Sequence, residues 1–155
     1  MNKFFWGITA AALLTGMTGG CGKSDGGPPL VPAEGVVILD GKPLANADVM
    51  FIPQEGTAGQ ALFGRTDAEG RFRMATPDGK RQGAAVGRYK VTIQKLVKPD
   101  GSDFIPDPNA GPMDTGGFRE LLPPRFASEA ETQLEAEVPV GGTRDLRFDL
   151  KLRRS

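Results

Sequence analysis

Apolar and polar residues alternate along several short stretches of this chain, which is the pattern of a strand with one buried face. In residues 89–94, for example, a Tyr, a Val and an Ile alternate with polar residues. No stretch has the spacing of a convincing amphipathic helix. The alternation predicts about seven strands, which we place at residues 34–39, 47–52, 60–66, 71–74, 89–93, 134–138 and 146–152.

Short strands with one apolar face each need a second sheet to cover those faces. Turn residues separate the strands, and the Asp40-Gly41 pair between two of them is a strong hairpin signal. A chain of 155 residues is long enough for one domain and hardly for two. The sequence therefore predicts a single all-β sandwich with an immunoglobulin-like architecture over residues 34–155.

Residues 98–124 interrupt this pattern, because they are rich in Pro, Gly and Asp and show no periodicity. A loop of about 27 residues is unusual in a compact domain and often carries function. Its carboxylates Asp100, Asp103, Asp107 and Asp114 are candidate calcium ligands, since calcium binds six to eight oxygens. Their spacing does not match the D-x-[DN]-x-[DN]-G calcium loop. We interpret them as solvated loop residues and expect neither a metal nor a cofactor.

The first 20 residues are organised like an export signal. Lys3 precedes a mostly apolar run over residues 4–17, and small residues lead up to Cys21. This run is shorter than the roughly 20 apolar residues that a membrane-spanning helix needs. We therefore predict that residues 1–20 are a signal peptide.

Cys21 is the only cysteine, and it stands where cleavage would occur. With Gly19 and Gly20 before it, the segment resembles a bacterial lipoprotein signal, although Thr18 occupies the position where Leu is usual. The resemblance implies that Cys21 carries a lipid and that residues 21–33 form a flexible tether. An ordinary cleaved signal and an uncut segment are the alternatives.

The composition excludes several classes of function. Lys and Arg number 19 and balance 19 Asp and Glu, so the chain lacks the basic surface expected of a nucleic-acid-binding protein. There is no His, which removes the commonest general base, the commonest metal ligand and every Ser-His or Cys-His pair. We therefore expect a protein that is not an enzyme.

Five basic residues lie on or near the predicted strands, namely Arg71, Arg73, Arg81, Arg88 and Lys90. One interpretation is a basic patch that binds an anionic glycan or a lipid headgroup. The other, which we favour, is that they protect exposed sheet edges against pairing with another chain.

Four short motifs follow one another along the chain. They are G-x-V at residues 35–37, G-x-P-L-x-x-A-x-V at 41–49, T-D-x-x-G-x-F at 66–72 and G-x-Y-x-V at 87–91. This ordered set resembles the carboxypeptidase regulatory-like domain, and the resemblance implies a transthyretin-like sandwich of about seven strands. The C-terminal part, from residue 122 to 151, is similar to the end of small planctomycete-type lipoproteins that carry this domain alone.

These observations predict an envelope-anchored lipoprotein whose sandwich is a binding or structural module at the cell surface or in the periplasm. Its expected partners are the membrane, through the lipid, and an unidentified envelope protein or glycan. The alternatives are assembly into a surface layer by strand addition, a secreted or periplasmic location, and a hydrolase of unknown type. Hydroxyisourate hydrolases share the fold class but need His and a C-terminal Y-R-G-S motif, which this chain lacks.

Overall fold

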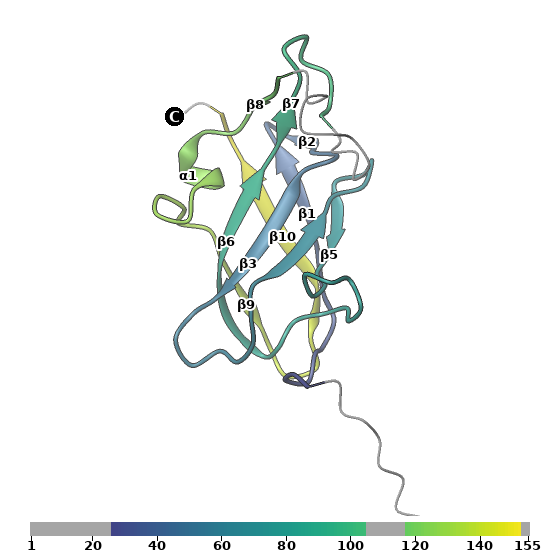
Figure 1. Cartoon of the computed structure of the whole chain (residues 1–155), viewed down its shortest axis with the longest axis vertical. Coiled ribbons are helices and arrows are strands. Elements are labelled where there is room, and N and C mark those ends of the chain that lie inside the picture. The colour runs from purple at the N-terminus through teal and green to yellow at the C-terminus, as the bar shows by residue number, and fades with distance from the viewer. Residues whose placement is uncertain (1–25, 105–116, 153–155) are drawn as a thin grey trace, which may run out of the picture.

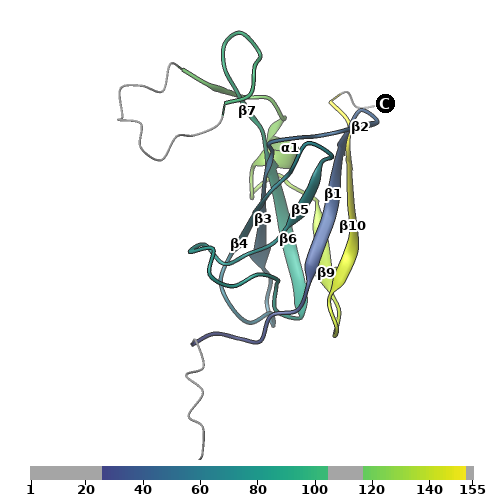
Figure 2. The ribbon, with the colours of Figure 1, turned by 90° about the vertical axis from the view of Figure 1, so that its right-hand side faces the viewer.

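The alternating segments fold into two four-stranded sheets that face each other across one apolar core (Figures 1 and 2). The computed structural model describes residues 26–104 and 117–152. The first sheet consists of β1 (Ala33–Leu39), β2 (Lys42–Pro43), β5 (Arg71–Arg73) and β10 (Thr143–Leu150). The second sheet consists of β3 (Asp48–Pro53), β4 (Leu62–Arg65), β6 (Gly87–Gln94) and β9 (Glu135–Val138).

Strand β1 is the centre of the first sheet. It pairs in parallel with β10 along one edge and antiparallel with β5 and β2 along the other. The second sheet is antiparallel throughout, in the order β4-β3-β6-β9. A separate two-stranded ribbon pairs β7 (Leu96–Val97) with β8 (Arg119–Glu120), and the one-turn helix α1 (Pro124–Ala127) follows it.

The predicted all-β sandwich is confirmed, and each of the predicted strands corresponds to one of β1, β3, β4, β5, β6, β9 and β10. Two details of the alternation were wrong. Thr92 was expected to face solvent, but it is buried, because α1 packs against the outer side of β6. Leu152 was expected to face the core, but it is exposed, because β10 ends at Leu150. In the described residues, no helix is long and apolar enough to cross a membrane.

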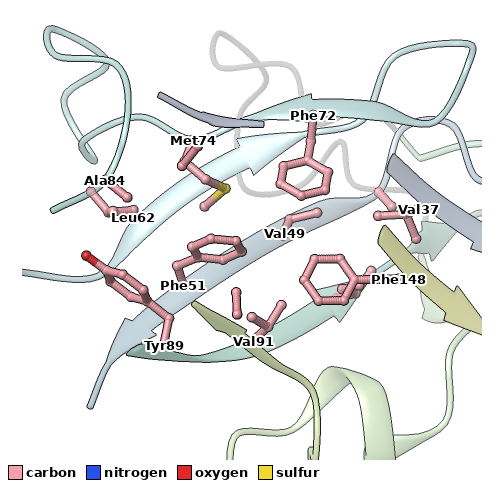
Figure 3. Packing of buried hydrophobic residues seen from close by; sticks show 14 of the residues in the cluster. Val37, Val49, Phe51, Leu62, Phe72, Met74, Ala84, Tyr89, Val91 and Phe148 are labelled. Carbon is pink, nitrogen blue, oxygen red and sulfur yellow. The ribbon is translucent and has the colours of Figure 1, made fainter. Parts of the chain in front are cut away.

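Four aromatic rings join the two sheets (Figure 3). Phe51 of the second sheet lies with its ring centroid 6.1 Å from Phe72 and 6.5 Å from Phe148, which both belong to the first sheet. Tyr89 of β6 lies 5.5 Å from Phe51 on the other side. Such edge-to-face and offset pairs stabilise the core beyond the burial of their area. The cluster therefore fixes how the two sheets stack.

The folded part of the chain begins earlier than predicted. Residues 28–33 were assigned to the flexible tether, but their backbone is hydrogen-bonded to the sandwich. Val31 and Ala84 exchange two N–H···O bonds of 2.9 Å, and Thr143 N donates to the carbonyl of Pro32 at 2.7 Å. This part of the predicted tether is therefore an integral part of the domain.

The domain has two distinct ends. The chain enters at one end, which the β9–β10 turn shares, because Thr143 at the start of β10 is bonded to Pro32. The β7–β8 ribbon projects from the other end (Figures 1 and 2). We call the first end the tether pole and the second the loop pole.

The aromatic cluster predicts the largest single-site loss of stability in this core. Phe148→Ala should lower the free energy of unfolding by about 3–5 kcal/mol, because it removes a buried ring that contacts both Phe51 and Phe72. Phe63→Ala is the matched control, since Phe63 lies on β4 with 44% of its surface exposed. Urea denaturation measures both, and equal losses would contradict the assignment of the core.

Candidate functional site

The described part of residues 98–124 is more ordered than the predicted structureless loop. Strands β7 and β8 pair at its base, and Phe104 N donates to the carbonyl of Leu96 at 3.2 Å. Between them, Lys98 N donates to the carbonyl of Ser102 at 2.8 Å and closes a turn. We call β7, β8 and the described residues 98–104 and 117–118 the ribbon. The expected loop thus contains β8 and ends at the first residue of α1, and its base is hydrogen-bonded to the sandwich.

An ion pair between a buried lysine and a partly exposed aspartate fixes the ribbon to the sandwich. Lys95, one residue beyond β6, is only 4% exposed. Its Nζ donates to the carbonyl of Ala45 at 2.6 Å and to Oδ1 of Asp103 at 2.6 Å. Asn46 Nδ2 donates to Oδ2 of the same carboxylate at 2.6 Å. Asp103 therefore ties the ribbon both to the end of β6 and to the loop before β3.

Electrostatics explains why these partners are needed. A buried ammonium is costly unless it is paired and hydrogen-bonded. The hydrogen bond from Lys95, with a second from Asn46, lowers the pKa of Asp103 below its usual range, so the carboxylate is charged at neutral pH. Asn46 has a φ of +52°, a conformation that Asn tolerates better than most residues. Asp103 thus supplies the negative charge that the Lys95 ammonium requires, and Asn46 supplies a second donor to the same carboxylate.

Glu120 forms a second connection between the ribbon and the sandwich. Its Oε1 accepts hydrogen bonds from Lys95 N at 2.8 Å and from Leu122 N at 2.9 Å. Leu121 N in turn donates to the carbonyl of Lys95 at 2.8 Å. Leu122 is buried in the core, so both strands of the ribbon are anchored where they leave the domain.

Of the four candidate calcium ligands, the structure describes Asp100 and Asp103, and both are engaged in hydrogen bonds. Asp100 Oδ1 accepts bonds from Ser102 N and Oγ at 2.9 and 2.7 Å, and these bonds lower its pKa. Both oxygens of Asp103 are already bonded, as described above. Asp107 and Asp114 lie outside the described residues. Within the residues described, no three acidic or Cys side chains are grouped in a way that could hold a metal ion.

The five predicted basic residues also fail to form one patch. Arg71 and Arg73 lie on β5 of the first sheet, whereas Arg88 and Lys90 lie on β6 of the second. The register sets each of the two β6 residues opposite a glutamate of β9, and Arg73 Nε pairs with a glutamate of β1 at 2.9 Å. Arg81 is elsewhere, at the tether pole, where it donates to a backbone carbonyl.

The ribbon carries an aromatic pair that the sequence reasoning missed. Phe104 and Phe118 stack with their ring centroids 4.9 Å apart, and Phe118 is 51% exposed. Exposed aromatic rings are common at the centre of binding surfaces, because they bury much area and lose little side-chain entropy. The only sequence signal was one Phe in each half of a polar segment.

A hollow of about 380 Å³ lies near the tether pole, and this volume is within the range of small-molecule sites. Tyr89 and Arg81 are among its lining residues, and the Tyr89 hydroxyl donates to the carbonyl of Ala85 at 2.8 Å. Thr76 Oγ1 donates to Asp78 at 2.6 Å, which lowers the pKa of Asp78. Such a carboxylate is a poor general base at neutral pH. The hollow therefore offers contact surface and no evident activated nucleophile.

No protein-family model, no curated protein and no solved structure matches this chain. The features of this chain that bear on function are therefore its two poles and the ribbon.

The buried ion pair predicts a measurable loss on neutralising one partner. Asp103→Asn should lower the free energy of unfolding by about 1–3 kcal/mol, because the buried Lys95 ammonium loses its anion while Asp103 itself is partly exposed. Asp100→Asn is the matched control, since an amide oxygen can keep the local bonds to Ser102. An equal loss in both variants, measured by urea denaturation, would refute a special role for Asp103.

The same pair should also respond to pH. Since the pKa of Asp103 is lower in the folded than in the unfolded chain, its stabilising contribution is present above the ordinary carboxyl pKa. That contribution is lost as the pH falls through the lowered folded value. The stability difference between wild type and Asp103→Asn should therefore shrink in acid. A difference that stays constant from pH 7 down to about pH 2 would contradict this.

The engaged carboxylates predict no response to calcium. Millimolar calcium should leave the melting temperature of the protein unchanged, because Asp100 is already bonded to Ser102, and Asp103 to Asn46 and Lys95. Thermal unfolding with and without the ion measures this, with magnesium as the control divalent cation. A rise specific to calcium would restore the metal-site hypothesis.

Proposed function

We propose that this protein is an envelope lipoprotein, anchored by a lipid on Cys21, whose sandwich is a non-enzymatic binding module. In this proposal the ribbon at the loop pole is the binding surface, and an envelope protein or glycan is its partner. One observation carries the proposal: the chain enters at the tether pole, and the ribbon projects from the opposite end (Figure 2). An anchor before the tether pole would therefore present the ribbon away from the membrane.

The construction of the ribbon supports a recognition role. Its base is fixed by Lys95, Asp103 and Glu120, whereas Phe118, the residue before β8, remains half exposed. A surface that is already ordered loses less entropy on binding than a flexible loop does. A structural extension with no partner would not need an exposed Phe118 stacked on Phe104.

The details of the fold also support membership in the carboxypeptidase regulatory-like family. In the T-D-x-x-G-x-F motif, Asp67 Oδ1 accepts bonds from Glu69 N and Arg71 N, and Gly70 has a φ of +73°. A Cβ on Gly70 would lie 2.6 Å from the carbonyl oxygen of Val37. The motif thus has a structural use in this chain, namely to form the turn that leads Arg71 into β5 beside β1.

Assembly by strand addition is the second candidate. Strand β10 lies at the edge of the first sheet and is eight residues long, which is enough to template another strand. It is, however, heavily charged, and Arg147 pairs with Asp149 at 2.7 Å on its surface. Charged edges disfavour pairing, so this feature supports a binding module over an assembly protein.

The first experiment tests the anchor. Protein extracted from cell membranes should have the mass of a chain that begins at Cys21 plus its acyl groups, because acylation replaces the signal peptide as the membrane attachment. The Cys21→Ser variant should lose both the added mass and the partitioning into membranes. Intact-mass spectrometry and detergent phase partitioning measure these two properties.

An unmodified chain in the soluble fraction would overturn the proposed anchor. The secreted or periplasmic alternative would then be favoured. A photo-crosslinking residue at position 118 tests the binding role independently, with the same residue at position 63 as the control, because both side chains are exposed. Equal cross-linking at both positions would contradict the ribbon as the binding surface.

A further inference from the structure

The stretch of chain between Cys21 and the folded domain is short. Arg81 Nη2 donates to the carbonyl of Pro28 at 2.6 Å, and the two backbone bonds of Val31 follow directly after it. Pro28 is thus the first residue with a hydrogen bond to the sandwich in the described part of the chain. Seven residue steps separate it from Cys21, so a fully extended backbone spans at most about 25 Å.

Close contacts show that this entering segment is seated on the domain. A Cβ on Gly83 would lie 2.3 Å from the carbonyl oxygen of Val31, and a Cβ on Gly59 would lie 3.2 Å from Cγ of Pro28. Only glycine permits the first approach, and Gly83 also has a φ of +104°. The segment from Pro28 onward is therefore part of the tether pole. Only residues 21–28, which we call the leash, connect Cys21 to the domain.

The β9–β10 turn lies beside the entering chain. A Cβ on Gly142 would lie 2.4 Å from the carbonyl oxygen of Pro32, so the turn and the entering chain are in contact. Val140 in this turn is 89% exposed, the most exposed of the large hydrophobic residues that the structure describes. An apolar side chain at the tip of a glycine-rich turn is suited to enter the headgroup region of a bilayer.

Two arginines at the same pole have no acidic partner among the residues that the structure describes. Arg144 follows Thr143, which is bonded to Pro32, and Arg81 is bonded to Pro28. In the described parts of the chain, neither guanidinium forms an ion pair with a carboxylate. Both remain able to face an anionic headgroup.

We propose that the tether pole rests on the bilayer that holds the lipid of Cys21, with the Val140 turn in the headgroup region and Arg81 and Arg144 facing anionic lipids. This inference depends on the lipid anchor proposed above. Burying one valine contributes only about 1.5–3 kcal/mol, which is too little to hold a free protein on a membrane. A leash of at most about 25 Å keeps the pole at high local concentration near the surface, so a weak contact suffices.

Tryptophan fluorescence can test this contact, because the only tryptophan of the sequence, Trp6, lies in the predicted signal peptide and is absent from the mature chain. Val140→Trp places a single reporter at the tether pole, and Phe118→Trp places the same reporter at the loop pole. Both acylated full-length mature proteins are reconstituted into vesicles of phosphatidylcholine and phosphatidylglycerol that contain brominated lipid. Fluorescence at position 140 should be quenched at least twofold and shifted to shorter wavelength, whereas that at position 118 should be unchanged.

A longer leash provides the second arm of the test. Twenty Gly and Ser residues inserted between Asp25 and Gly26 should reduce the quenching at position 140, because they lower the local concentration of the pole at the surface. Replacing phosphatidylglycerol by phosphatidylcholine should also reduce the quenching at position 140, because Arg81 and Arg144 then lose their anionic partners. Quenching that is insensitive to the leash would contradict the role given to the short tether.

The outcomes separate this inference from the lipid anchor. Intact mass is measured first on the same samples, and a chain without acyl groups overturns the anchor and the inference together. An acylated protein whose Trp at position 140 is quenched no more than that at position 118 overturns the inference alone. In that case the domain is anchored, but it has no fixed orientation on the membrane.

Discussion

The parallel pairing of β1 with β10 is the constraint on which the rest of the structure depends. It joins the first and last strands of the domain and makes β1 the one strand of its sheet with partners on both edges. Gly35 permits this packing, because a Cβ there would lie 2.4 Å from the carbonyl oxygen of Leu146 and 2.8 Å from the ring of Phe72. Once β10 is in place, Phe148 completes the aromatic cluster between the sheets.

The ion pair of Lys95 has a different role from the core. The pair buries little apolar surface, but it holds the ribbon, which is rich in polar residues, at a defined position on the sandwich. Removing either partner would leave the other charge without its counter-ion, which is costly. The intact pair adds little net stability, because desolvation offsets the attraction, and its main effect is to specify one arrangement of the ribbon. The proposed binding surface thus depends on a polar contact, while the scaffold below it depends on apolar packing.

The proposed activity follows from the separation of these two ends. The entering chain, the Val140 turn, Arg81 and Arg144 lie at one pole, and the ribbon with Phe118 lies at the other. In the proposed function, a short leash turns this separation into a fixed orientation relative to the membrane. Recognition at the far pole then needs no catalytic group.

The sequence by itself determined the strands and the sandwich, because the period-two burial of β9 or β10 and the turn at Asp67 are local properties of neighbouring residues. Only the tertiary structure decided what depends on distant partners. Lys95 bonds to Ala45, which lies 50 residues earlier in the chain, and residues 28–33 are bound to the domain through Ala84 and Thr143. The basic residues are divided between two sheets. No local pattern encodes these contacts, because they join segments as distant as Pro32 and Thr143, which are 111 residues apart.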